Sequence, residues 1–387
     1  MSAEEFETRC VHGAGPPDAQ TGAVVPPISL ASTFAQDAVG KHSGFEYSRS
    51  GNPTRAALER HVAMLEGAEH GMAFASGLAA EDAMLRMLAP GDALLLSDDA
   101  YGGTFRLARQ VHAPAGLEVR TVDLTDVDAV RDSWDERTKL VWVETPTNPL
   151  LRIVDVEALA ALAHERGALL AVDNTFATPA LQLPLALGAD VVVHSSTKYL
   201  GGHSDVVGGF VATNDTEIAA RVAFVQNAAG AVPGPLDCYL VHRGCRTLHL
   251  RMQRHCENAA SIVDALAGHP AVREVLWPGL PDHAGHDVAE RQMRGFGGMV
   301  SLRMAGGVDA ARAVCERTEL FTLAESLGAV ESLIEHPGLM THASVAGTPN
   351  EVPDDLVRLS VGIESASDLI ADLRQALDHA LSRTATG

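Results

Sequence analysis

One of the three lysines of this chain, Lys198, stands where an enzyme could use its amine. It follows Asp190–Thr197, which contains three consecutive valines and ends in three hydroxyl-bearing residues. The valine run is typical of a buried strand. Lysine is seldom buried without a role, and burial lowers the pKa of the amine so that it can form a Schiff base. A lysine in a structural ion pair would explain this segment equally well, so the neighbouring motifs must decide.

Two segments could supply a phosphate site near this amine. Ser76–Ala80 reads as a turn from a strand into a helix, where free backbone amides bind phosphate and Gly77 permits close approach. The hydroxyls of Ser195 and Thr197 could complete that site. Taken alone, the Ser76 turn is equally typical of an ordinary helix cap.

Two more side chains could serve a planar, nitrogen-containing ring. Asp173 ends the apolar segment Ala171–Asp173, where it could cap the chain or hold a ring nitrogen protonated. Tyr101 lies in the loop segment Asp98–Thr104, where its ring could stack on a cofactor. A phosphate site, a ring-nitrogen acid, a stacking aromatic ring and a Schiff-base lysine together predict a pyridoxal phosphate site.

The elements around these residues read as an α/β fold. Short apolar runs predict buried strands at Gly71–Phe74, Ala93–Ser97, Leu140–Glu144, Leu169–Asp173 and Val191–His194. Amphipathic stretches predict helices at Leu78–Leu88, Val156–Glu165 and Thr216–Gln226. This alternation predicts a mostly parallel sheet covered on both faces, with ligands beyond the carboxyl ends of its strands. Ser76, Glu144, Asp173 and Ser195 lie at or just past such ends.

We expect three regions along the chain. Residues 1–60 show little periodicity and predict an extended arm, residues 61–248 a large cofactor-binding domain, and residues 249–387 a C-terminal domain. A long helical stretch at Pro235–Ala267 would link the two domains. The C-terminal part is expected to contain a strand at Met299–Met304 and helices at Asp309–Arg317 and Asp368–Leu381.

Composition narrows the classes of function. The chain has 387 residues and a net charge of −21, which argues against nucleic acid or an anionic membrane as a partner. No apolar stretch is long enough to span a membrane, and the acidic N-terminus lacks a secretory segment. Five cysteines without a CxxC pair indicate reduced thiols. We therefore expect a soluble cytoplasmic protein.

The chain resembles the Cys/Met-metabolism family of pyridoxal-phosphate enzymes, which includes the cystathionine γ-synthases and γ-lyases. Ordered motifs along nearly the whole chain carry the resemblance: Tyr47–Thr54, Ser76–Ala80, Asp99–Thr104, Glu144–Pro149, Val172–Thr175, Ser195–Asp205, Glu325–Gly328, Met340–Ser344 and Val357–Gly362. The resemblance implies fold type I, which is the aspartate aminotransferase-like fold, with a smaller C-terminal α/β domain.

At matching positions the family implies roles toward the cofactor. Lys198 would hold pyridoxal 5'-phosphate as a covalent aldimine and later move protons, while Asp173 would pair with the pyridinium nitrogen and Tyr101 would stack on the ring. The phosphate would be bound by Gly77, Leu78, Ser195 and Thr197. Tyr47 and Arg49 would reach the phosphate of a neighbouring subunit, within a homotetramer built as a dimer of dimers.

The family also implies a substrate site for an amino acid. Arg358 would bind the α-carboxylate in bidentate fashion, which lysine cannot reproduce, and Asn148 and Ser326 would line the same pocket. Without the surrounding motifs, Arg358 could be an ion-pair residue and Asn148 a turn residue before Pro149.

Residues farther from the lysine bear on the choice of substrate. Arg106 resembles the arginine that family members use for a distal carboxylate, and Glu325 and Glu46 could meet the distal ammonium of cystathionine. Methionine γ-lyases carry a cysteine where this chain has Gly103. We expect a cystathionine γ-lyase, which forms cysteine, 2-oxobutyrate and ammonia by α,γ-elimination. The alternative is a γ-synthase that joins an O-acylhomoserine to cysteine; a methionine γ-lyase fits less well.

Three rival interpretations are weaker. His242, Cys245 and His249 share a helical face and could suggest a metal, but structural zinc usually takes four ligands at compact spacing. Neither GxGxxG nor GxxxxGK[ST] occurs, which disfavours nucleotide binding. A regulatory binding protein on the same scaffold should have lost Lys198 or Asp173, and both are present. No metal is therefore expected.

Overall fold

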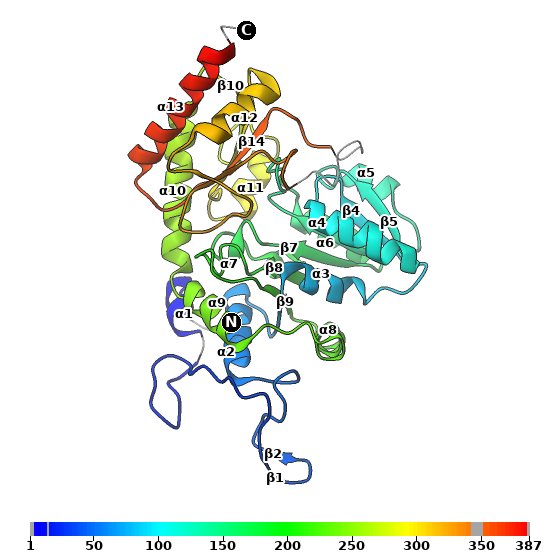
Figure 1. The fold of residues 1–387 in the computed structure, drawn as a ribbon. Coiled ribbons are helices and arrows are strands. Elements are labelled where there is room, and N and C mark those ends of the chain that lie inside the picture. The colour runs from blue at the N-terminus through cyan, green and yellow to red at the C-terminus, as the bar shows by residue number, and fades with distance from the viewer. Residues whose placement is uncertain (1–3, 14, 342–350, 385–387) are drawn as a thin grey trace.

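Two large sheets organise the computed structural model, which describes residues 4–13, 15–341 and 351–384 (Figure 1). The larger sheet has seven strands in the order β3-β9-β8-β7-β6-β4-β5. These strands are β3 (His70–Phe74), β4 (Ala93–Ser97), β5 (Glu118–Val122), β6 (Thr138–Glu144), β7 (Leu169–Asp173), β8 (Val191–Ser195) and β9 (Gly209–Thr213).

The larger sheet is mostly parallel, as the alternation of strands and helices predicts. β5, β4, β6, β7 and β8 run in one direction, while β9 lies antiparallel to both β8 and β3. The five predicted strands are confirmed. β5 and β9 were not predicted, because β5 carries charged residues within its run and β9 follows a loop rich in glycine. In register, Glu144 of β6 lies beside Asp173 of β7, so two carboxylates end neighbouring strands.

Helices cover both faces of this sheet, because each central strand is apolar on both sides. Along β6, Leu140 and Trp142 pack toward α3 and α8, whereas Val141 and Val143 pack toward α5 and α6. The helices and short turns of this part are α3 (Gly77–Leu85), α4 (Gly102–Arg106), η1 (Leu107–His112), η2 (Ala113–Ala115), α5 (Val127–Asp132), α6 (Val156–Glu165), α7 (Thr178–Leu181), η3 (Pro184–Leu187) and α8 (Thr216–Ala229).

A five-stranded sheet forms the second part, in the order β10-β11-β14-β13-β12. Its core packs against α10, α12 and α13, and α10 and α13 lie side by side at the edge of the molecule (Figure 1). The elements are α10 (Leu248–Leu266), β10 (Val272–Leu276), α11 (His286–Gln292), β11 (Met299–Met304), α12 (Gly307–Arg317), β12 (Thr322–Leu323), β13 (Leu333–Glu335), β14 (Leu356–Ser360) and α13 (Ala366–Thr384).

The N-terminal segment is only partly extended. It projects from the body and carries a small hairpin of β1 (Gln36–Ala38) and β2 (Lys41–His42), but it also contains α1 (Phe6–His12) (Figure 1). α2 (Pro53–Glu66) begins before residue 61, where we expected the arm to end. The Asn52 side chain accepts the amides of Thr54 and Arg55, and Pro53 fits the first turn, so the helix begins at Pro53.

The segment Pro235–Ala267, predicted as a long helical stretch, is helical except for a short break that divides it into two helices, α9 (Pro235–Cys245) and α10. The carbonyl of Gly244 accepts hydrogen bonds from the Arg251 guanidinium (2.8 Å) and the Thr247 hydroxyl (3.3 Å). A Cβ atom at Gly244 would lie 2.2 Å from the carbonyl oxygen of Gly201, so the glycine allows this close approach. The chain turns between the two helices at Arg246 and Thr247.

Within the described ranges, no helix combines the length and the apolar character that a membrane crossing needs.

Candidate active site

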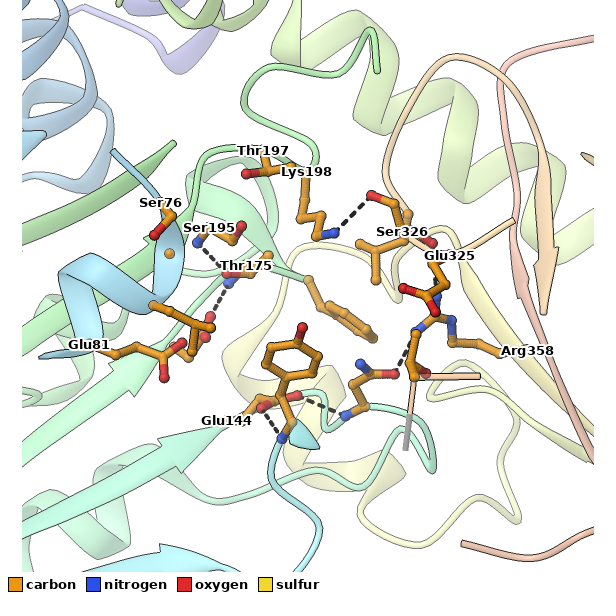
Figure 2. Close-up of a pocket in the computed structure, with 18 residues that line it drawn as sticks. Ser76, Glu81, Glu144, Thr175, Ser195, Thr197, Lys198, Glu325, Ser326 and Arg358 are labelled. Carbon is orange, nitrogen blue, oxygen red and sulfur yellow. Dashed lines mark hydrogen bonds between the residues drawn. The ribbon is translucent and has the colours of Figure 1, made fainter. Parts of the chain in front are cut away.

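A cavity of about 280 Å³ opens where the carboxyl ends of β6, β7 and β8 meet α3 and the second sheet (Figure 2). Most of the site residues expected from the sequence line it: Gly77, Leu78, Tyr101, Asn148, Asp173, Ser195, Thr197, Lys198, Glu325, Ser326 and Arg358. The carboxyl ends of parallel strands meet at one edge of a sheet. The site residues at those strand ends therefore come together here, as the sequence predicts.

Lys198 points into this cavity from the turn after β8, and its Nζ donates a hydrogen bond to the Ser326 hydroxyl at 2.8 Å (Figure 2). Burial lowers the pKa of this amine to about 8, with a further contribution from the Arg358 charge, while Glu335 and Glu325 oppose the shift. The amine is therefore much closer to neutrality at physiological pH than an exposed lysine, which is what a nucleophile requires.

Asp173 is held in place at the end of β7 by Thr175. The Thr175 amide donates to Asp173 Oδ1 at 2.9 Å, and the Thr175 hydroxyl accepts from the Ser195 amide at 2.9 Å. Burial raises the pKa of Asp173, while the hydrogen bonds from Thr175 and the electrostatic effect of nearby His194 oppose that rise. The carboxyl group is thus oriented by backbone and side-chain contacts from two neighbouring strands.

The N-terminus of α3 lies close against Ser195. Gly77 makes this approach possible because it has no side chain. Ser76 caps the helix by accepting the Ala79 amide at 3.1 Å, while the Gly77 and Leu78 amides, in the first helical turn, have no intrahelical acceptor. A Cβ atom at Gly77 would lie 2.9 Å from the Ser195 Cβ. These amides form an anion-binding end to the cavity.

Glu144 ties two cavity loops together. Its Oε2 accepts the Tyr101 amide at 3.0 Å and its Oε1 accepts the Asn148 amide at 2.9 Å (Figure 2). Burial raises the pKa of Glu144 well above its usual value, and the neighbouring Asp173 raises it further. Glu144 therefore places both Tyr101 and Asn148 at the cavity wall.

Arg358 of β14 anchors the opposite end of the cavity. Its guanidinium donates to Asn148 Oδ1 and to the Ser326 carbonyl, both at 2.8 Å, and pairs with Glu335 at 2.9 Å. Arg358 and Glu335 are both buried, and Arg358 Nε has no partner among the described residues. Ser326 has a φ of 89°, an uncommon left-handed conformation for serine that these contacts hold.

The chain matches the family model described as Cys/Met metabolism PLP-dependent enzyme over residues 7–378. The cystathionine gamma-synthase of Mycobacterium tuberculosis is 60% identical over 372 residues, which are 96% of each chain. The cystathionine gamma-lyase of Dictyostelium discoideum is 50% identical over 375 residues, 96% of this chain and 97% of that protein. This chain belongs to the Cys/Met-metabolism family of pyridoxal-phosphate enzymes.

Solved structures agree with this membership. Cystathionine gamma synthase from Xanthomonas oryzae pv. oryzae in complex with cystathionine matches with a TM-score of 0.96 and 45% identity, over 98% of this chain and all of that chain. The expected family, its fold type I architecture and the pyridoxal phosphate cofactor are therefore confirmed. This chain is a pyridoxal-phosphate-dependent enzyme.

The cavity suits the family's cofactor. The α3 amides and the Ser195 and Thr197 hydroxyls offer donors for a phosphate at one end, Asp173 offers a carboxylate for a ring nitrogen, and the Lys198 amine lies between them and Arg358. This donor set combines the phosphate site, charge partner and amine that pyridoxal phosphate requires.

Four predicted residues do not line the cavity of their own chain. Tyr47 and Glu46 are exposed on the N-terminal segment, and Arg49 donates to the Asn227 carbonyl at 2.7 Å with its guanidinium over the Tyr47 ring. Arg106 is exposed at the end of α4, although its charge lowers the pKa of Tyr101. The Met340–Ser344 motif continues into residues 342–344, which lie outside the described residues.

Sequence reasoning missed two buried acids, Glu335 and Glu81, and placed Glu144 at a strand end without giving it a role. Glu335 ends an apolar strand as Asp173 and Glu144 do, and that pattern could have indicated it. Glu81 follows Gly77 by four residues and so lies on the same face of α3 toward the cavity.

Two of the three residues of the metal hypothesis, His242 and Cys245, have other contacts. His242 Nδ1 lies 2.9 Å from His61 Nδ1, and Cys245 Sγ donates to the Leu200 carbonyl. In the described part of the chain, no group of His, Cys, Asp and Glu side chains could hold a metal ion.

Proposed function

We propose that this enzyme makes or breaks the bond between sulfur and Cγ of cystathionine. The observation that carries the proposal is the pairing, in one cavity, of the partly buried Lys198 amine with the Arg358 guanidinium, with Glu325 on the same wall. Cystathionine has an amino-acid group at each end, so a cation for one carboxylate and an anion for the distal ammonium suit it. The cystathionine complex of the Xanthomonas relative supports the same substrate class.

At the α-carboxylate, we assign Arg358 as the binding residue, oriented by Asn148, Ser326 and Glu335. Two parallel hydrogen bonds to a carboxylate would fix the direction of the Cα–H bond toward Lys198. Bound there, pyridoxal phosphate supplies an electron sink for the charge left on Cα. Asp173 would keep that sink positively charged.

Lys198 is assigned as both anchor and proton carrier. As a free amine, Lys198 would accept the Cα proton of the substrate, and it would then serve the proton transfers at Cβ that precede loss of the γ substituent. Burial favours the neutral amine, which is the form that can accept a proton. Tyr101 would stack on the ring and assist these transfers; burial raises the pKa of its hydroxyl, so that the hydroxyl stays protonated.

Two directions of reaction use the same residues. In γ-replacement, the sulfur of cysteine takes the place of the acyloxy group at Cγ of an O-acylhomoserine, which gives cystathionine and the free acid. In α,γ-elimination, cystathionine and water give cysteine, 2-oxobutyrate and ammonia. The 60% identity to a γ-synthase, against 50% to a γ-lyase, favours γ-replacement as the main reaction. The 50% identity to a γ-lyase over nearly the whole chain supports α,γ-elimination as the second candidate.

One experiment separates the two directions. The purified holoenzyme is incubated with cystathionine, and separately with an O-acylhomoserine plus cysteine, while 2-oxobutyrate and cystathionine are measured. Rapid cystathionine formation with little 2-oxobutyrate supports γ-replacement as the main reaction, and the reverse result supports α,γ-elimination. Failure of both reactions would overturn the proposal.

We further propose a cytoplasmic homotetramer in which Tyr47 and Arg49 complete the phosphate site of a neighbouring subunit. Exposed apolar side chains on the projecting segment, including Val24 and Leu30, suit burial against a partner. The same assembly would bring Glu46 to a substrate site. The division into an arm at residues 1–60 and domains at 61–248 and 249–387 belongs to this proposal.

Subunit mixing tests the shared site. Lys198→Ala and Arg49→Ala subunits, each inactive or weakened alone, are refolded or exchanged together. Hybrids should regain activity, because one site of each mixed dimer then carries neither substitution. Mixtures with no more activity than the separate variants would contradict a shared site.

A further inference from the structure

Glu81 is a buried carboxyl group of the cavity to which the proposed reaction gives no role. It projects from α3 one turn after Gly77, is 4% exposed, and lines the cavity together with Asp173 and Glu144 (Figure 2). Figure 2 shows it at the α3 end, on the opposite side from Arg358 and Glu325. A third carboxyl group at this end of the site calls for a physical explanation.

The three carboxyl groups differ in what holds them. Glu144 accepts two backbone amides, and Asp173 accepts the amide of Thr175. Glu81 Oε2, in contrast, is buried and has no hydrogen-bond partner among the described residues. Hydrogen bonds from amides stabilise a carboxylate, whereas a buried oxygen without them favours the neutral acid.

The charges around Glu81 act in the same direction. Asp173 on β7 is the charged group that most raises its pKa after burial, and Glu81 in turn raises the pKa values of Glu144 on β6 and Tyr101 before α4. The hydroxyl of Thr104 on α4 opposes the shift only in part, and the pKa of Glu81 reaches about 8. The cations of the cavity lie elsewhere, with Lys198 bound to Ser326 and Arg358 paired with Glu335.

We propose that Glu81 is a positioning residue that stays a neutral carboxylic acid in the working enzyme and so leaves Asp173 as the negative charge facing the ring nitrogen. The inference rests on the proposed pairing of Asp173 with that nitrogen. Ionisation of Glu81 would place a second negative charge beside Asp173 and Tyr101, and the electronic environment of the bound cofactor would change.

The neighbouring acid Asp82 offers a matched control. It lies one residue further along α3 but binds Arg86 at 2.7 Å and His112 at 2.9 Å instead of lining the cavity. Glu81→Gln keeps the shape of the neutral acid and removes its titration, whereas Asp82→Asn removes an equivalent charge outside the cavity.

The test is a pH titration of the visible absorption band of the three holoenzymes from about pH 6 to about pH 10. Wild type and Asp82→Asn should show a transition near pH 8 that Glu81→Gln lacks. A transition shared by all three proteins belongs to the Lys198 linkage. Titrations of wild type and Glu81→Gln that superimpose would overturn the proposal.

Infrared spectroscopy provides an independent readout. The wild type minus Glu81→Gln difference spectrum should contain the C=O stretch of one neutral carboxyl group at neutral pH, because Glu144 contributes to both proteins and cancels. This band should remain in Asp82→Asn and decline above pH 8. An infrared difference spectrum without that band would also overturn the proposal. If Glu81→Gln does not fold, Glu81→Met takes its place. Asp173→Asn, measured in parallel, tests the role of Asp173 separately: an unchanged cofactor spectrum there would contradict the proposed function rather than the protonation of Glu81.

Discussion

At one end of the cavity, Asp173 and Ser195 come from neighbouring strands of one parallel sheet, whereas at the other end Arg358, Ser326 and Asn148 come from three distant segments. The first end is built by strand pairing, so the backbone places its side chains. The second end depends on a side-chain contact between the two parts of the chain, the hydrogen bond from Arg358 to Asn148, and on the buried Arg358–Glu335 pair between neighbouring strands of the second sheet. A conservative substitution at the first end should therefore lower activity and leave stability unchanged. At the second end it should lower both activity and stability.

The largest effect is expected at Lys198, which lies between the two ends. Lys198→Ala removes the anchor and the proton carrier together, so kcat should fall by about 10³-fold or more and the visible band of the linked cofactor should disappear. Lys139→Ala is the control, because that lysine is exposed and donates to the Glu136 carbonyl. A Lys198→Ala protein that keeps the band would contradict the assignment.

Asp173→Asn tests the end built by the sheet. The amide keeps the shape but cannot provide the negative charge, so activity should fall by about 10²-fold while the fold is kept. Asp190→Asn, at the opposite edge of the same sheet, is the control, since Asp190 binds the Leu170 amide and His164. Thermal unfolding and steady-state kinetics give the measurement; equal losses of activity in both variants would show that the charge at Asp173 has no special part.

Arg358→Lys tests the end built by side-chain contacts. Loss of the planar fork should lower kcat/KM by about 10- to 100-fold, mainly through KM, because charge-assisted bidentate hydrogen bonds are lost. The variant should also be less stable, since Glu335 loses its best partner. Arg303→Lys, in an ion pair with Asp355 outside the cavity, is the matched control. An unchanged KM would argue against carboxylate binding by Arg358.

The smallest expected effect is the pH dependence of stability that comes from the Lys198 amine, which lies between the two ends of the cavity. The pKa of Lys198 is about 8 in the folded protein against 10.5 for an ordinary lysine. The unfolded chain therefore holds more protons between those values, and the stability of the cofactor-free protein should rise with pH across this window. We expect a gain of about 2–3 kcal/mol relative to Lys198→Met.

Denaturant unfolding of both cofactor-free proteins at several pH values measures this difference, with Lys139→Met as the control. Parallel stability curves for wild type and Lys198→Met between pH 8 and pH 10.5 would show that the amine is not desolvated in the folded protein.

The sheet-built end could be read in large part from the sequence. Five strands, the turn at Ser76, and the positions of Asp173 and Lys198 follow from apolar runs that stop at polar residues, and parallel pairing then brings those stops to one edge. The strand β9 and the break between α9 and α10 were not predicted. Both depend on contacts with remote segments, such as Gly244 against Gly201.

By itself, the sequence determined the family, the cofactor and the chemical identity of the anchoring lysine, because these are encoded in local motifs. Only the tertiary structure decided which acids share the cavity and which carboxyl oxygen among the described residues is buried there without a hydrogen-bond partner. Glu81 and Glu335 look like ordinary helix and strand residues until folding buries one beside Asp173 and pairs the other with Arg358. Burial and the distance between charges set the protonation and the roles of these acids. Both quantities are fixed only when folding brings together residues as far apart in sequence as Asn148 and Arg358.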